Sequence, residues 1–281
     1  MSDFKFKFSE SGNSEEDYTT EKEVIKWIES EEINPTFQLD NLDDIVKHAK
    51  MYTNGDIGIG HVVPSEVIHN TRAKSVANGL QLAEQNHSDL IAGTYEGGLK
   101  IWECTNDLVT YIIKNIDAIS WDKAKVLDLG CGAGILGILA LHNGSDVVFQ
   151  DYNKEVLEYV TIPNVLLNIE EENRKNEIGK CKFYSGDWES FNKLLGDEKY
   201  DYILTSETIY NPDNYTKITS IINERLCKNG VAFVAAKTYY FGVGGGMREF
   251  ESYVQKNNNL NIEVCWKSKT GIQREILKIT K

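Results

Sequence analysis

The sequence of 281 residues lacks the features that mark several classes of protein. Its five cysteines include no CxxC pair, so neither a zinc site nor a disulfide framework is indicated. No stretch approaches the roughly 18 apolar residues of a membrane-spanning helix, and the N-terminus lacks the basic-then-apolar layout of a signal peptide. The five histidines show no paired ligand spacing. We therefore expect a soluble intracellular protein without a metal site.

Positive charge is also scarce in this chain. The 30 lysine and arginine residues are outnumbered by 43 aspartate and glutamate residues, which gives a formal net charge of −13. Proteins that bind nucleic acids normally carry a basic face, so we expect no direct contact with nucleic acid and no membrane partner. An acidic surface instead steers a basic protein or peptide toward it.

The chain divides into three parts by composition and pattern. Residues 1–34 are acidic and poor in aliphatic side chains, which is typical of a mostly disordered tail with at most one short helix, at Val24–Ile28. Residues 35–98 are weakly patterned and predict an N-terminal cap, with a strand at Val62–Val63 and a helix from Ile68 to Leu82. Residues 99–281 predict one α/β domain.

Strand and helix patterns alternate through the third part. A helix is expected over Asp107–Ile116 with Thr105 as its N-cap. The expected strands are Lys125–Leu129, Asp146–Gln150, Cys181–Ser185, Tyr202–Thr205 and Val231–Ala236, separated by helices at Ile135–His142, Glu155–Leu167, Glu189–Leu195 and Asn214–Cys227. Such repeats predict a Rossmann-like, mostly parallel sheet with helices on both faces. Two final strands, Ile262–Trp266 and Ile272–Ile279, flank a turn at Gly271 and predict an antiparallel hairpin.

A glycine cluster follows the first of these strands. Gly130, Gly132 and Gly134 have the GxGxG spacing, whereas a dinucleotide fingerprint needs its third glycine where Ile135 stands. Glycine allows the backbone to approach a ligand closely, and the helix that follows offers free N–H groups. The cluster predicts a site for a smaller nucleoside ligand, with Asp128 able to hold the ammonium group of that ligand. A structural turn without a ligand is the alternative.

Acidic residues follow the next two strands. Asp151 ends the second strand, where a carboxylate accepts from both ribose hydroxyls; capping of the next helix is its alternative role, which Asn153 could fill instead. After the third strand, Asp187 can accept from an adenine amino group, and Trp188 offers a stacking face. Together these residues predict a nucleoside pocket.

Three further segments lie at the same edge of the predicted sheet. Glu207 and Tyr210 follow the fourth strand, three residues apart on a turn, and both could point at a substrate; for Glu207, a carboxylate that stabilises a helix start is the alternative. The segment Tyr95–Thr105 predicts a lid over the cofactor. The segment Tyr239–Gly246 predicts a substrate-contacting loop.

These motifs carry a family resemblance. The GxGxG loop, the acid at position 151 and the closing hairpin resemble class I methyltransferases that use S-adenosylmethionine. More narrowly, four segments resemble the eukaryotic histidine protein methyltransferases: Gly97–Thr105, Phe149–Asn153, Ser206–Pro212 and Tyr240–Gly246. The resemblance begins near residue 88. It implies methylation of one histidine, on the ring nitrogen distal to the backbone, in a large-subunit ribosomal protein.

The resemblance and the motifs together give expected positions for the cofactor and the substrate. We expect S-adenosylmethionine to be bound by Ile101, Trp102, Glu103, Cys104, Thr105, Asp128, Gly130, Gly132, Gly134, Asp151, Tyr152, Asn153, Gly186, Asp187, Trp188 and Ser206. We expect Glu207, with Tyr210, to be catalytic by accepting from the ring N–H of a neutral imidazole, which leaves the other nitrogen to attack. We further expect a monomer that works in the cytoplasm and nucleus.

Two alternatives stay open at this point. Relatives that methylate lysine usually carry Asp where Glu207 stands, yet they share the acid-x-x-Tyr turn, so lysine methylation is the first alternative. The second is a catalytically silent ribosome-assembly factor that retains the cofactor fold.

Overall fold

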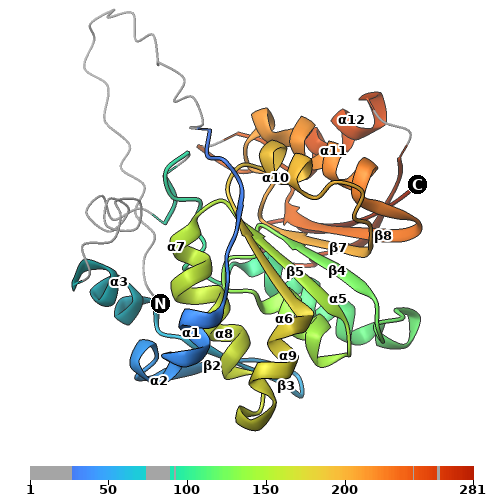
Figure 1. Ribbon diagram of the computed structural model, residues 1–281. Helices are drawn as coiled ribbons and strands as arrows, with labels where there is room; N and C mark the ends of the chain where they lie inside the picture. The colour runs from blue at the N-terminus through green and yellow to red at the C-terminus, as the bar shows by residue number, and fades with distance from the viewer. Residues whose placement is uncertain (1–26, 74–88, 92, 243, 258–259) are drawn as a thin grey trace, which may run out of the picture.

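The computed structural model describes residues 27–73, 89–91, 93–242, 244–257 and 260–281. Figure 1 shows their arrangement, a central sheet with helices packed on both sides. The strands are β1 (Glu31–Glu32), β2 (Ala49–Asn54), β3 (Ile57–Val62), β4 (Lys125–Leu129), β5 (Asp146–Asp151), β6 (Cys181–Ser185), β7 (Tyr200–Ser206), β8 (Leu226–Lys237), β9 (Asn261–Lys267) and β10 (Arg274–Thr280). The α-helices are α1 (Thr36–Asp40), α2 (Leu42–Ile45), α3 (Pro64–Ala73), α5 (Glu103–Lys114), α6 (Ile135–His142), α7 (Lys154–Val156), α8 (Ile162–Leu167), α9 (Arg174–Glu177), α10 (Trp188–Leu194), α11 (Tyr215–Arg225) and α12 (Met247–Asn257).

The large sheet has eight strands in the described residues, in the order β1-β6-β5-β4-β7-β8-β10-β9. The five strands from β6 to β8 run parallel to one another. β10 pairs antiparallel with both β8 and β9, and β2 with β3 forms a separate two-stranded sheet. The predicted mostly parallel sheet with a closing antiparallel hairpin is thus confirmed. In the described part of the chain, no helix has the length and apolarity needed to cross a membrane.

Each face of the sheet is covered by its own set of helices. Side chains alternate between the two faces of a strand, and β4 shows this clearly. Val126 packs in one core cluster, together with side chains of α5, α6 and α8. Leu127 and Leu129 pack in a second cluster, with side chains from α10, α11 and α12. The cofactor motifs lie beyond both cores, at the carboxyl ends of the strands.

Helix α6 is apolar on all sides because it is enclosed on all sides. Its first seven residues are buried, and a Cβ on Gly137 would lie 2.2 Å from Cε1 of Phe149 on β5. A helix without a polar face is expected only in such a position. The tight packing fixes the N-terminus of α6 directly behind the glycine cluster.

The helix predicted over Glu155–Leu167 is continuous but irregular. Leu157–Thr161 forms a π-helical turn between α7 and α8. Pro163 lacks the N–H that would bond the carbonyl four residues earlier, and a widened turn accommodates such a gap. The wide turn presents Thr161, whose hydroxyl donates to the Gly132 carbonyl at 2.6 Å. The irregularity therefore supports the glycine cluster.

Three other helices differ from the sequence-based expectation. Helix α5 begins at Glu103 rather than after Thr105, whose hydroxyl bonds the Ser206 hydroxyl at 2.7 Å instead of capping the helix. Helix α3 begins at Pro64, a favourable first helical residue; the predicted continuation of this helix beyond residue 73 lies outside the described residues. Helix α12 was not predicted, although Met247, Phe250 and Val254 have helical spacing and are buried.

The described end of the acidic segment lies against the edge of the sheet. Glu31 and Glu32 pair with β6, and the Asp187 N–H donates to the Ile28 carbonyl at 2.9 Å. Residues 27–34, which belong to the segment predicted to be a mostly disordered tail, are therefore part of the fold. The rest of that predicted tail, residues 1–26, lies outside the described residues.

Ser190 links this segment to α10, which gives a first testable prediction. Its hydroxyl accepts from the Ser30 N–H at 2.9 Å and donates to Glu29 at 2.8 Å. We expect Ser190→Ala to lower the free energy of unfolding by about 1–2 kcal/mol, because a buried N–H loses its acceptor. Chemical denaturation measures the change. Ser252→Ala, which removes an exposed hydroxyl, is the control, and equal effects from the two variants would contradict the role given to Ser190.

Candidate active site

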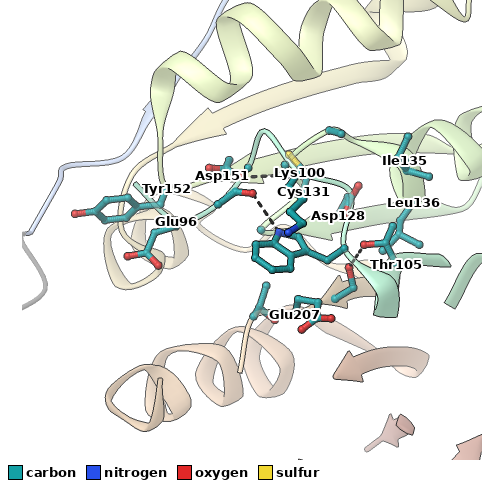
Figure 2. Close-up of a pocket in the computed structure, with 18 of the residues that line it drawn as sticks. Glu96, Lys100, Thr105, Asp128, Cys131, Ile135, Leu136, Asp151, Tyr152 and Glu207 are labelled. Atoms are coloured by element: carbon teal, nitrogen blue, oxygen red, sulfur yellow. Dashed lines mark hydrogen bonds between the residues drawn. The ribbon is translucent and has the colours of Figure 1, made fainter. Parts of the chain in front are cut away.

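A cavity lies at the carboxyl ends of β4, β5, β6 and β7 (Figure 2). It brings together residues that are distant in the sequence, because parallel strands present their carboxyl ends at one edge. The predicted site residues that line it are Ile101, Trp102, Thr105, Asp128, Gly130, Gly132, Asp151, Tyr152, Gly186, Asp187, Trp188, Ser206, Glu207 and Tyr210.

Four predicted cofactor residues do not line the cavity: Glu103, Cys104, Gly134 and Asn153. They hold the residues that do. Asn153 accepts from the Glu96 N–H at 3.0 Å and donates to the Thr94 carbonyl at 2.8 Å, so it ties the 94–96 segment to β5. Gly134 begins α6 with φ at 75°, a conformation in which a side chain is disfavoured.

The glycine cluster leaves no room for side chains. At Gly130, φ is +67°, and a Cβ would lie 2.6 Å from Cγ2 of Thr208. At Gly132, φ is +49°, and a Cβ would lie 3.2 Å from the Gly98 carbonyl oxygen. Only glycine fits at both positions, and because glycine has no side chain, a ligand in the cavity can approach the backbone there closely.

Two buried acids accept hydrogen bonds from the backbone of the glycine cluster and of α6. Asp128 accepts from the Gly137 N–H of α6 at 2.8 Å. Asp151 accepts from the N–H groups of Gly132 and Asn153, each at 3.0 Å. Burial raises the pKa of Asp128 to about 8 and that of Asp151 to about 6, against the opposing effect of these hydrogen bonds. Asp128 thus caps α6 as well as facing the cavity.

The raised pKa of Asp128 predicts how stability depends on pH. Between its unfolded pKa near 4 and its folded pKa of about 8, the folded protein binds more protons, so this group makes stability fall as pH rises. We expect Asp128→Asn to remove about 2 kcal/mol of the loss between pH 6 and pH 8. Urea unfolding of both proteins at the two pH values measures it, and parallel pH profiles would contradict the assignment.

The predicted lid packs on the glycine cluster. The Leu99 N–H donates to the Tyr95 hydroxyl at 2.8 Å, and the Trp102 indole N–H donates to the Gly97 carbonyl at 3.1 Å. A Cβ on Gly98 would lie 2.7 Å from a methyl group of Val156. The lid is therefore held in place by its own hydrogen bonds and by this close packing.

Glu96 is a further acid of this site that was not singled out from the sequence. It lines the cavity beside Tyr152, and Figure 2 shows both side chains on the same side of the pocket. Burial raises the pKa of Glu96 to about 7, against the hydrogen bond from the Gly93 N–H. The available signal was its place inside the segment already assigned to the lid.

Trp188 and Asp187, which also line the cavity, are held by protein contacts. The Trp188 indole N–H donates to Gln150 at 2.7 Å, and the Gln150 side chain donates to the Gly186 carbonyl at 2.8 Å. One Asp187 oxygen caps α10 at the Glu189 N–H, 2.8 Å away, and the other lies 2.5 Å from Lys217 Nζ. The carboxylate of Asp187 is thus already engaged, and its contact with an adenine stays a prediction.

Glu207 has an unusual backbone and a closely held carboxylate. Its φ is 59°, which costs a non-glycine residue on the order of 1 kcal/mol and is often found at functional sites. Glu207 is 8% exposed to solvent. It accepts from the Tyr240 hydroxyl at 2.5 Å and from the Cys104 N–H at 3.4 Å.

Tyr240 and Lys237 join this centre from the end of β8. Lys237 Nζ lies 3.2 Å from Glu103 and 3.9 Å from Glu207. The rings of Tyr210 and Tyr240 meet edge to face, with centroids 6.2 Å apart. Neither Tyr240 nor Lys237 was singled out from the sequence, although Tyr240 belongs to the loop predicted to contact the substrate.

Comparison with known proteins agrees with this site. The family model described as Lysine methyltransferase matches residues 81–242. A histidine protein methyltransferase 1 homologue of Dictyostelium discoideum is 45% identical over 195 residues, which cover 69% of this chain and 60% of the relative. A homologue of Rattus norvegicus is 40% identical, with 78% of this chain and 67% of the relative covered. The chain spans about 60% of the length of the first of these relatives.

The yeast relative and a solved structure extend the comparison. Histidine protein methyltransferase 1 of Saccharomyces cerevisiae is 31% identical, over 77% of this chain and 74% of that protein. A solved structure from Streptococcus mutans, assigned as a SAM-dependent methyltransferase, aligns with a TM-score of 0.53 at 10% identity, over 83% of this chain and 55% of that one.

The strand order, the closing hairpin and the cavity at the strand ends define the fold of a class I methyltransferase. Within this class, the chain belongs to the histidine protein methyltransferase family. The family predicted from the sequence motifs is thereby confirmed.

Proposed function

We propose that this protein transfers a methyl group from S-adenosylmethionine to the distal ring nitrogen of a histidine in a protein substrate. The observation that carries the proposal is the Glu207 carboxylate, held by Tyr240 and Cys104 in the wall of the cavity. The family of the chain supports the same activity.

The cavity fits a cofactor that combines a nucleoside with an amino acid. Asp151 and Glu96 provide carboxylates for hydroxyl donors. Trp102 provides an aromatic face. Ile135 and Leu136 line the cavity at the N-terminus of α6, where backbone N–H groups favour a carboxylate, although Asp128 already accepts from that of Gly137. When bound, the cofactor would supply a sulfonium methyl that is already activated for displacement.

The protein then has to orient one imidazole and stabilise one charge. The Glu207 carboxylate accepts from one ring N–H of the target histidine, so that the lone pair on the other nitrogen faces the methyl donor. The same carboxylate stabilises the positive charge that the ring acquires on methylation. Tyr240 and Cys104 fix this carboxylate in advance, which reduces the reorganisation that the reaction requires.

We further propose that the substrate is a basic protein, a large-subunit ribosomal protein, and that the enzyme acts as a monomer in the cytoplasm and nucleus. The net charge of −13 supports a basic substrate. A second candidate activity, lysine methylation, is favoured by the description of the matching family model.

Labelling of proteins with radioactive methyl groups tests these activities. The purified protein is incubated with methyl-tritiated S-adenosylmethionine and either ribosomal fractions or a ribosome-depleted lysate, and the products are hydrolysed to amino acids. Label in tele-methylhistidine is expected, from the ribosomal fraction. Label in methyllysine would favour the second activity. Calorimetric binding of the cofactor without any transfer would favour a silent assembly factor.

A further inference from the structure

Lys237 places a cation beside the proposed catalytic carboxylate. It is the last residue of β8, its side chain is 17% exposed, and its Nζ lies between Glu103 and Glu207. The ammonium also lies 5.7 Å from the ring centroid of Trp102 and 5.8 Å from that of Tyr240. Lys237 is not among the residues that line the cavity, but these contacts hold its charge beside Glu207 and Trp102, which are.

Lys237 partly balances the negative charge of its two carboxylate neighbours. Glu103 and Glu207 together contribute two negative charges, of which Lys237 compensates one. Two other neighbours stay neutral. Burial raises the pKa values of the Tyr240 hydroxyl and the Cys104 thiol, and the negative charge of Glu207 raises them further.

The next charged groups along α5 and β10 compensate each other. Arg274 contacts Asp107 with two nitrogens, at 2.5 and 3.3 Å. Burial alone would raise the pKa of Glu103, but the charge and hydrogen bond of Lys237, a backbone hydrogen bond and, least, the charge of Arg274 together lower it.

Lys100 also lines the cavity and lies 4.6 Å from the Trp102 ring centroid, but it pairs with Asp89 at 2.7 Å. Within the described residues, Lys237 is the cation that forms an ion pair with Glu207.

That balance matters because only a neutral imidazole can attack a methyl group. Two uncompensated carboxylates would favour the imidazolium, since an opposite charge within about 4–6 Å stabilises the charged form of a group. Glu207 is needed as an acceptor, so its charge has to be balanced rather than removed.

We propose that Lys237 sets the protonation state of the target side chain by keeping the bound histidine neutral near pH 7. The inference rests on the proposed histidine methylation. Lys237 is a positioning residue in this scheme, acting through the field around Glu207 and exchanging no proton or methyl group itself.

The pH dependence of methyl transfer tests this role. Wild-type protein and the variant Lys237→Met are assayed from pH 5.5 to pH 9 with tritiated cofactor, and ribosomal proteins are added until the initial rate no longer increases. The saturated rate reports the pKa values of the bound complex. Methylhistidine and methyllysine are quantified separately after hydrolysis.

We expect the acidic limb of histidine methylation to move up by about one pH unit in Lys237→Met, with the rate recovering at high pH. Lys237→Arg should keep the wild-type profile, because it preserves the charge. Lys180→Met, which removes an exposed cation far along the chain from the site, is a charge-matched control and should also keep that profile.

Two results would overturn the proposal, and they differ. A uniform loss of rate at every pH in Lys237→Met, with the acidic limb unmoved, would show that Lys237 has only a structural role. The variant Lys237→Gln, and calorimetry with S-adenosylhomocysteine, establish that such a loss does not come from misfolding. Absence of methylhistidine from the wild-type reaction would overturn the proposed function itself, and this inference with it.

Discussion

Glu207→Gln is expected to lower the rate of methyl transfer by about 10²–10³-fold, the usual effect of removing one group that stabilises a developing charge. The amide has the size of the carboxylate but no charge to balance the methylated ring. It also offers one oxygen where the structure has two acceptors, which serve Tyr240 and Cys104. Initial rates with tritiated cofactor measure the change.

Binding of the cofactor should be nearly unaffected by the same substitution. The affinity for S-adenosylhomocysteine, measured by calorimetry, should stay within about threefold of the wild-type value, because less than 1 kcal/mol separates such affinities. Glu249→Gln, on the exposed face of α12, is the matched control and should transfer methyl groups normally. Unchanged turnover in Glu207→Gln would remove this carboxylate from the mechanism.

Asp151→Asn is expected to weaken binding of S-adenosylhomocysteine by about 10–100-fold, since a buried charged acceptor is worth about 1.5–3 kcal/mol. The carboxylate accepts from two backbone N–H groups, those of Gly132 and Asn153. An asparagine keeps one acceptor and turns an NH₂ group toward the other donor. The glycine cluster would then lose a contact that holds its shape, in addition to the acceptor for the cofactor.

The stability of Asp151→Asn should change far less than its affinity. Burial raises the pKa of Asp151 to about 6, so the ionised carboxylate opposes folding at neutral pH. The substitution removes this cost and also weakens two hydrogen bonds, and the two effects on stability oppose each other. Thermal unfolding without ligand and calorimetry with ligand separate the two quantities. Asp213→Asn, an exposed aspartate in the 3₁₀ turn before α11, is the control. Equal affinities of the two variants would show that Asp151 does not contribute to the cofactor site.

The sequence predicts this site well where the chain signals it locally. A buried apolar strand with glycine or an acid at its end marks a carboxyl end. Asp151 is the last residue of such a strand, and Gly130, Asp187 and Glu207 come within two residues after one. Because parallel strands share one edge, local signals are sufficient to place these four residues around one cavity.

The rest of the site depends on contacts that no local pattern encodes. Lys237 and Glu103 are 134 positions apart in the sequence, and they pair only because α5 packs against β8. The positive φ of Glu207 is also invisible in the sequence, since glutamate disfavours it. Asp187 carried a clear signal, but Lys217, which pairs with it, lies on a different helix.

The position of β10 has a consequence for the synthesis of the protein. Although it lies at residues 274–280, β10 is inserted between β8 and β9, and Arg274 pairs in register with Lys237. Until those residues have left the ribosome, β8 is an open edge, and exposed edges are prone to pair with other chains. A product that stops before Arg274 would lack the partner of Asp107 as well as the neighbour of β8. We therefore expect such truncated chains to aggregate rather than to persist as enzymes of reduced activity.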